Sequence, residues 1–63
     1  SYEGDILDLA VAGNIIEKTG AWFSYDNIKI GQGRENSKNY LKENNDVLKS
    51  VVEKVKAFMG LGN

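Results

Sequence analysis

The chain has 63 residues, a net charge of −1, and neither cysteine nor histidine. This length gives one small domain, and a composition of 41% apolar and 27% charged residues is typical of a soluble globular fold. The missing residue types exclude a disulfide framework, the usual zinc ligands and histidine-based catalysis. No run reaches the roughly 18 apolar residues of a membrane helix, so we expect an intracellular, cytoplasmic module without a membrane partner.

The charge is unevenly distributed along the chain. Residues 1–28 hold five acids against one lysine, a net charge of −4, whereas residues 29–63 hold seven cations against four acids, a net charge of +3. Such a split can give a compact domain a basic face. From the charge alone, cations that merely solvate helix surfaces are the simpler interpretation.

The first half of the chain predicts a helix and then a sheet. Residues 5–12 place Ile6, Leu9 and Ala10 at helical spacing, and Gly13-Asn14 ends this helix. Residues 15–18, 21–25 and 28–31 are short β-prone runs, and the pairs Thr19-Gly20 and Asp26-Asn27 between them favour tight hairpins. We therefore predict a three-stranded antiparallel meander.

The register of the meander follows from counting outward from the two turns. This count pairs Phe23 with Ile16 across the first turn and with Ile30 across the second. One face then carries the apolar residues Ile16, Ala21, Phe23, Tyr25, Ile28 and Ile30, with Lys18 at its rim. The other face carries Ile15, Glu17, Trp22, Ser24 and Lys29.

The second half of the chain predicts two helices. Residues 34–43 form the first, and Asn45 is the expected N-cap of the second. The apolar face of the last helix is Val47, Leu48, Val51, Val52, Val55, Phe58 and Met59, and residues 60–63 are expected to fray. The predicted class is α+β: a short N-terminal helix, the meander, and two C-terminal helices packed on one sheet face.

Enzymatic motifs are weak in this sequence. Gly31-Gln32-Gly33 before a helix resembles a phosphate-binding turn, but no Walker sequence follows, and glycines that only turn the chain are the favoured interpretation. Asp5 and Asp8 could hold a cation, although a solvated helix face explains them more simply. Trp22 could stack on a base, but in so small a domain we expect it in the core.

A stronger candidate is an anion-binding site formed by basic side chains. Lys18 ends one predicted strand, Lys29 lies in another, and Arg34 begins the following helix, so all three could meet on one rim. Together with a helix N-terminus they would grip the phosphate backbone, and Lys38 completes the predicted DNA-binding set. No helix carries the residues needed to read base edges, so we expect non-specific binding.

These residues resemble a known family. Residues 5–10 (DILDLA), 15–18 (IIEK), 20–25 (GAWFSY), 30–36 (IGQGREN) and 40–44 (YLKEN) are similar, in order and without gaps, to the C-terminal domain of bacterial RecA recombinases. The resemblance implies a single domain over residues 1–63, excised from a larger chain whose ATPase core would precede residue 1. ATP and Mg would bind in that core, so this fragment should hold no cofactor and catalyse nothing.

The resemblance also implies a role. RecA-type recombinases form filaments on single-stranded DNA, exchange strands in recombination and repair, and trigger the SOS response. Their C-terminal lobe helps to capture duplex DNA through basic residues, which match Lys18, Lys29 and Arg34 here. Asp26 departs from the basic residue that some members have, and the family's acidic tail, expected after Asn63, is absent. The alternative is a lobe that contacts the core domain, filament neighbours or regulators, with incidental basic residues.

Overall fold

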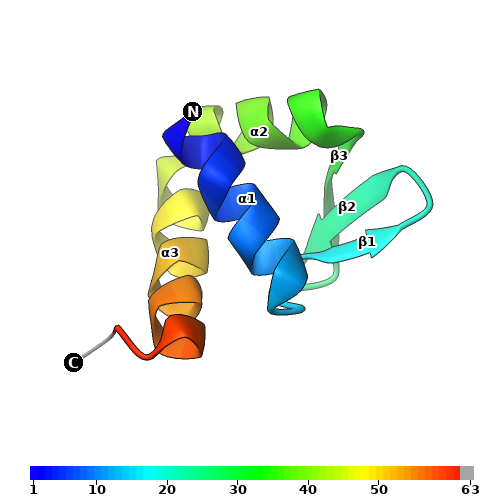
Figure 1. Cartoon of the computed structure of the whole chain (residues 1–63). Coiled ribbons are helices and arrows are strands. Elements are labelled where there is room, and N and C mark those ends of the chain that lie inside the picture. The colour runs from blue at the N-terminus through cyan, green and yellow to red at the C-terminus, as the bar shows by residue number, and fades with distance from the viewer. Residues whose placement is uncertain (62–63) are drawn as a thin grey trace.

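Three helices lie to one side of a small sheet in the computed structural model, which describes residues 1–61 (Figure 1). The elements are α1 (Tyr2–Ala12), β1 (Glu17–Thr19), β2 (Trp22–Tyr25), β3 (Ile28–Gln32), α2 (Arg34–Glu43) and α3 (Asn45–Met59). The sheet is antiparallel with strand order β1-β2-β3. The predicted α+β class and the order of its elements are therefore confirmed. No helix within residues 1–61 is both long and apolar enough to cross a membrane.

Helix α1 begins three residues earlier than predicted. The Ser1 hydroxyl accepts a hydrogen bond from the Gly4 amide at 3.1 Å and so caps the helix, a signal that the apolar spacing did not contain. The predicted stop is confirmed. Asn14 adopts a φ of 57°, and the Gly13 amide donates to the Leu9 carbonyl at 3.0 Å.

The first hairpin differs from the prediction by one residue. Its turn is Gly20-Ala21, so Lys18 pairs with Phe23 and Thr19 pairs with Trp22. Of the two central residues only Gly20 has a positive φ, 60°, which is the pattern of a turn that requires glycine first. The predicted pairing of Ile16 with Phe23 is therefore wrong, because Thr19 belongs to the strand.

The second hairpin has the predicted turn but an unpredicted bulge. Asp26 and Asn27 both have positive φ, and Tyr25 pairs with Ile28 as expected. Beyond that the register shifts, and Phe23 pairs with Gly31 instead of the predicted Ile30. Ile30 is thus the additional residue of a bulge, which bends the strand locally and still leaves this side chain buried.

The helices α2 and α3 meet at Asn44. Helix α2 spans the predicted residues, but the N-cap position of α3 is occupied by Asn44 and not by Asn45. The Asn44 side chain donates to the Tyr40 carbonyl at 2.9 Å, so it closes α2 and does not cap α3. At the far end Gly60 terminates α3 with a left-handed φ of 74°. Residues 62–63 of the predicted tail lie outside the described residues.

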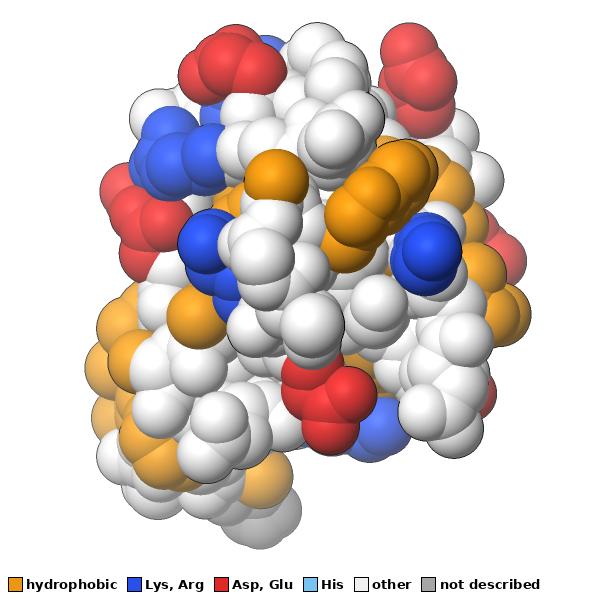
Figure 2. Space-filling model, turned by 90° about the vertical axis from the view of Figure 1, so that its right-hand side faces the viewer, with side chains coloured by type: hydrophobic (Ala, Val, Ile, Leu, Met, Phe, Trp, Pro, Cys, Tyr) orange, Lys and Arg blue, Asp and Glu red, His pale blue; other side chains and the backbone are white. Residues whose placement is uncertain are grey.

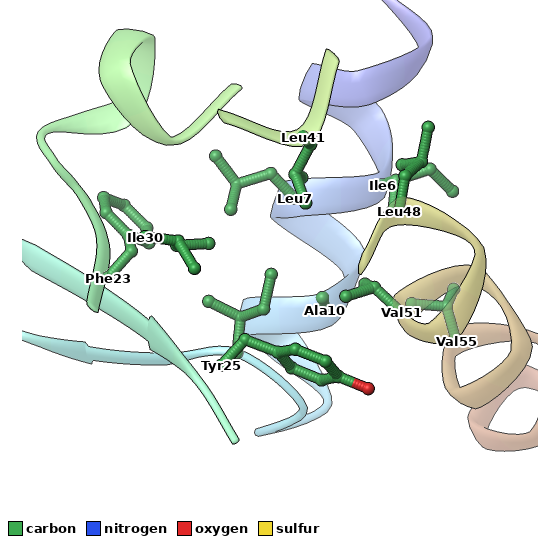
Figure 3. Packing of buried hydrophobic residues seen from close by; sticks show 11 residues of the cluster. Ile6, Leu7, Ala10, Phe23, Tyr25, Ile30, Leu41, Leu48, Val51 and Val55 are labelled. Atoms are coloured by element: carbon green, nitrogen blue, oxygen red, sulfur yellow. The ribbon is translucent and has the colours of Figure 1, made fainter. Parts of the chain in front are cut away.

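A single core joins all three helices to the sheet. Helix α1 lies between α3 and the sheet in Figure 1, and it contributes buried side chains to both sides. Figure 3 shows Leu7 beside Leu41 of α2, and Ala10 beside Val51 of α3. The cluster comprises eleven residues: Ile6, Leu7, Ala10, Ile16, Phe23, Tyr25, Ile30, Leu41, Leu48, Val51 and Val55.

Several residues predicted in the core are exposed. Ile28 is 60% exposed because the helices do not extend over the second turn, and Ala21 lies in the first turn. Trp22 is 39% exposed, which overturns its expected burial. Phe58 and Met59 lie beyond the end of the core, although one side of the Phe58 ring covers Gly13.

Candidate nucleic-acid interface

Each aromatic residue of β2 has a lysine above its ring. The Lys29 ammonium lies 4.9 Å from the Trp22 ring centroid, and the Lys54 ammonium lies 4.9 Å from that of Tyr25. Lys18 lies 5.7 Å from the Phe23 ring centroid. A cation over an aromatic face is attracted by the ring quadrupole without being neutralised, so these lysines keep their charge available to a ligand.

Lys29 and Trp22 define the outer face of the sheet, the face turned away from the helices. Lys29 pairs with Ser24, and Trp22 lies two residues from Ser24 along β2, so alternation places all three on this face. Lys29 is exposed, and no carboxylate within residues 1–61 lies within ion-pair distance of it. The pair offers a positive charge beside a flat apolar surface.

Lys18 lies on the other face of the same sheet. Its partner across the strands is Phe23, and consecutive residues of β2 alternate in direction, so Lys18 does not share the face of Lys29. Its ammonium donates a hydrogen bond to the Gly20 carbonyl at 2.7 Å, which holds the charge at the turn. The charge of Lys18 therefore lies at the edge of the sheet, beside the turn of the first hairpin.

Arg34 is held by a carboxylate. Its guanidinium donates to both oxygens of Asp8, from Nε at 3.1 Å and from Nη2 at 3.0 Å. This hydrogen bonding lowers the pKa of the Asp8 carboxyl. The arginine side chain remains 48% exposed, so the pair lies open to solvent. A phosphate would have to displace Asp8 or share the guanidinium with it.

Lys38 also has an acidic partner. Its ammonium lies 3.0 Å from Glu35, one turn earlier in α2, and lowers the pKa of that carboxyl. The Lys38 stem runs along α1, because a Cβ built at Gly4 would lie 3.4 Å from its Cδ and 2.9 Å from Arg34 Nη2. Arg34 and Lys38 thus lie together over the first turn of α1.

The start of α2 is fixed by two backbone contacts. Gly31 approaches α2 so closely that a Cβ there would lie 2.6 Å from the Ser37 amide nitrogen. The Gly33 amide donates to the Ala21 carbonyl at 2.7 Å and connects α2 to the first hairpin. The close packing at Gly31 and the turn at Gly33 account for these glycines, in agreement with the interpretation that they shape the chain.

The four predicted residues do not form a single cluster. Arg34 and Lys38 lie together over α1 with acidic partners, whereas Lys18 and Lys29 lie over aromatic rings on opposite faces of the sheet. Figure 2 shows one face of the molecule, on which the cationic side chains do not form one continuous patch. Their role in DNA binding stays a prediction.

One member of the site escaped the sequence prediction. Trp22 was expected in the core because of its residue type, although the alternation of β2 already placed it with Lys29 on the outer face. Alternation was the better signal. Residues 1–61 contain no group of three or more potential metal ligands. Asp5 and Asp8 were interpreted as a solvated helix face, and Asp8 forms an ion pair with Arg34 there.

The fold and these surface features define a small α+β domain with exposed cations on its surface. Comparison with known proteins specifies the family: the chain belongs to the RecA C-terminal domain family, which it matches over residues 4–60. It is 58% identical over 60 residues to Protein RecA of Campylobacter fetus subsp. fetus (strain 82-40), an alignment that covers 95% of this chain and 17% of that protein. It is 44% identical over 63 residues to Protein RecA of Bacillus subtilis (strain 168), covering 100% of this chain and 18% of that protein. The chain spans less than a fifth of the length of these curated relatives.

Proposed function

We propose that this domain captures duplex DNA for a RecA-type recombinase, through non-specific phosphate contacts, in recombination, repair and the SOS response. The whole protein would be a DNA-dependent ATPase of the bacterial cytoplasm that binds ATP and Mg in a separate core domain. This domain would contribute binding and no chemistry. Family membership supports the general role, and the exposed Lys29 over Trp22 is the observation that carries the DNA contact.

The proposed contact begins on the outer sheet face. Lys29 has no acidic partner within residues 1–61, so a phosphate can approach it without displacing a carboxylate. Lys18 would add a second charge at the hairpin edge, and Arg34 would join by exchanging Asp8 for a phosphate. Arginine suits such an exchange because its planar fork binds either anion through two hydrogen bonds.

The number of charges limits the expected affinity. With about two to three phosphates neutralised, the slope of log K against log salt should be only about −2 to −3. So few contacts should give the isolated domain a weak affinity. The domain also lacks the multivalency that a filament would add.

Backbone amide shifts during a titration with duplex DNA test the proposal. We expect the largest shifts at Lys29, at Trp22 and around Lys18 and Arg34, with smaller shifts along the exposed side of α3. Two duplexes of unrelated sequence should give the same map, because phosphates carry no sequence information. Shifts confined to α3 would contradict the proposed surface.

The alternative function is a lobe that contacts the core domain, filament neighbours or regulators. The two acid-paired cations favour it, because Arg34 and Lys38 are already neutralised in part. Charge reversal at Lys18 and Arg34 together, in the whole recombinase, separates the two functions. Loss of duplex uptake with intact filament assembly supports DNA capture, and the opposite result supports the protein-contact lobe.

A further inference from the structure

A cavity of about 220 Å³ lies where the second hairpin meets the junction of α2 and α3. Its apolar lining comes from β3, α2 and α3: Ile28, Ile30, Tyr40 and Val47. Its volume is below the roughly 300–1,000 Å³ of pockets for drug-sized ligands, so it suits one large side chain better than a whole small molecule.

Ile28 lines this cavity and is unusually exposed for a large aliphatic residue of a strand. Ile28 is 60% exposed, whereas Ile30, two residues further along the same strand, is 5% exposed. The helices cover Ile30 and leave Ile28 at the open end of the cavity, next to partly buried Tyr40 and Val47. An aliphatic side chain in a concave site gains more from being covered than one that projects alone from a surface.

The charged residues that line the cavity are both acids, Asp26 from the hairpin turn and Asp46 from the first turn of α3. Within residues 1–61 neither carboxylate lies within ion-pair distance of a cation. Interaction with the Tyr25 hydroxyl, and more weakly with Asp26, raises the pKa of Lys54, so this lysine offsets part of the Asp26 charge.

One wall of the cavity is fixed by a hydrogen bond. The Tyr25 hydroxyl and the Ser50 hydroxyl are 2.6 Å apart, which ties β2 to α3. In Figure 3 the Tyr25 ring extends from the sheet toward α3 with its hydroxyl at the far end. This contact holds the wall in place, so little ordering free energy is needed to fill the cavity.

We propose that this cavity docks a basic segment of a partner protein, which inserts one large apolar side chain and places lysine or arginine beside Asp26 and Asp46. Charge complementarity selects this occupant, since two carboxylates repel a phosphate backbone and attract a basic peptide. The proposal goes beyond DNA capture. Ile28 and Lys29 are consecutive in β3, so the protein-docking surface and the DNA surface lie on opposite sides of one strand.

A titration with the peptide acetyl-Gly-Lys-Leu-Arg-Gly-amide tests the docking site. The 63-residue chain serves as the sample, because one core of eleven buried residues joins its three helices to the sheet. We expect amide shifts at residues 26–30 and 46–50. Two control peptides, one with glycine for leucine and one with glutamates for the basic residues, should each lose most of this response. Equal shifts with the acidic control would overturn the proposal, as would shifts that change on dilution without peptide, which would indicate a second copy in the cavity.

Matched variants give a second, independent test. Ile28→Thr should weaken the peptide response roughly tenfold through lost apolar contact. Asp46→Asn should weaken it roughly twofold to fivefold, as expected of an exposed charge pair. The controls Met59→Thr and Glu53→Gln alter an exposed apolar residue and an exposed acid of α3 that do not line this cavity. If the controls weaken binding as much as the two cavity variants, the proposed site is wrong; spectra of the free variants verify that each one is folded.

Discussion

The two faces of the sheet differ in chemistry although they share the same strands. On β2 the adjacent residues Trp22 and Phe23 are 39% and 5% exposed, and each has a lysine above its ring. The inner face joins the hydrophobic core, and the outer face stays open with Lys29 beside the indole. One short strand can therefore both contribute to the core of a very small domain and present exposed side chains to solvent, because its side chains alternate in direction.

The sharpest test of this comparison is to truncate the two neighbouring aromatic residues. Phe23→Ala should lower the free energy of unfolding by about 3–5 kcal/mol, because it removes a buried ring and leaves a cavity. Trp22→Ala should cost less, about 1–2 kcal/mol, because 39% of the surface of this residue is already exposed. Urea unfolding followed by circular dichroism measures both, since the tryptophan signal is absent from one variant. Equal losses would mean that the outer face also supports the fold.

The next largest effect is expected on DNA binding. Lys29→Glu should weaken duplex affinity about tenfold at low salt and reduce the salt slope by about 1, with little change in unfolding. Fluorescence anisotropy with a labelled duplex measures both quantities. Lys49→Glu on α3 is the matched control, because it changes the net charge by the same amount elsewhere on the surface. A similar loss in the control would reduce the effect of Lys29 to one of net charge.

A smaller effect is expected on the inner face at Tyr25. Tyr25→Phe removes the hydrogen bond to Ser50 and should lower the free energy of unfolding by about 1 kcal/mol. Tyr40→Phe is the control, since its hydroxyl makes no side-chain hydrogen bond within residues 1–61, and it should change stability less. Urea unfolding measures the free energy of unfolding of both variants. If that of Tyr25→Phe equals that of the parent, the hydrogen bond to α3 makes no net contribution to stability.

The smallest expected effect concerns the ion pair outside the sheet. The folded-state pKa of Asp8 lies below its ordinary 3.8, so the pair stabilises the domain above that pH and loses this contribution as the pH falls through the lower folded-state value. Asp8→Asn should therefore be slightly less stable than the parent at neutral pH, and the difference should disappear in acid. Unfolding experiments between pH 7 and about pH 2 follow this convergence.

The same variant tests whether the carboxylate restrains DNA binding. Releasing Arg34 from Asp8 should raise duplex affinity about twofold to fivefold, the range expected for an exposed pair. Asp5→Asn serves as the control. It removes one negative charge from the same helix, but Asp5 forms no ion pair with Arg34 within residues 1–61. An identical gain in both variants would assign the change to net charge alone.

Local signals in the sequence predicted most of the fold. Helical spacing located α2 and α3, and the Asp26-Asn27 turn set the start of the second hairpin. The first hairpin was misplaced because glycine can occupy either central position of a tight turn, and only the structure shows that Gly20 comes first. The bulge at Ile30 was not predictable, because it depends on how β3 packs against the helices.

The candidate site was predicted less completely for a related reason. The identity of the cations came from residue type and family resemblance, but their environment depends on distant partners. Asp8 and Arg34 are 26 residues apart, so no local pattern pairs them. Trp22 shows that position in a strand can outweigh residue type in deciding burial.

The bond from the Gly33 amide to the Ala21 carbonyl has a geometric consequence for the basic residues. It joins the hairpin that carries Lys18 to the first turn of the helix that begins with Arg34. The bond therefore fixes the relative position of the backbone at these two residues. The separation between these two residues is thus a fixed property of the domain. An anionic polymer has a regular interval between its charged groups, and that interval either matches this separation or does not.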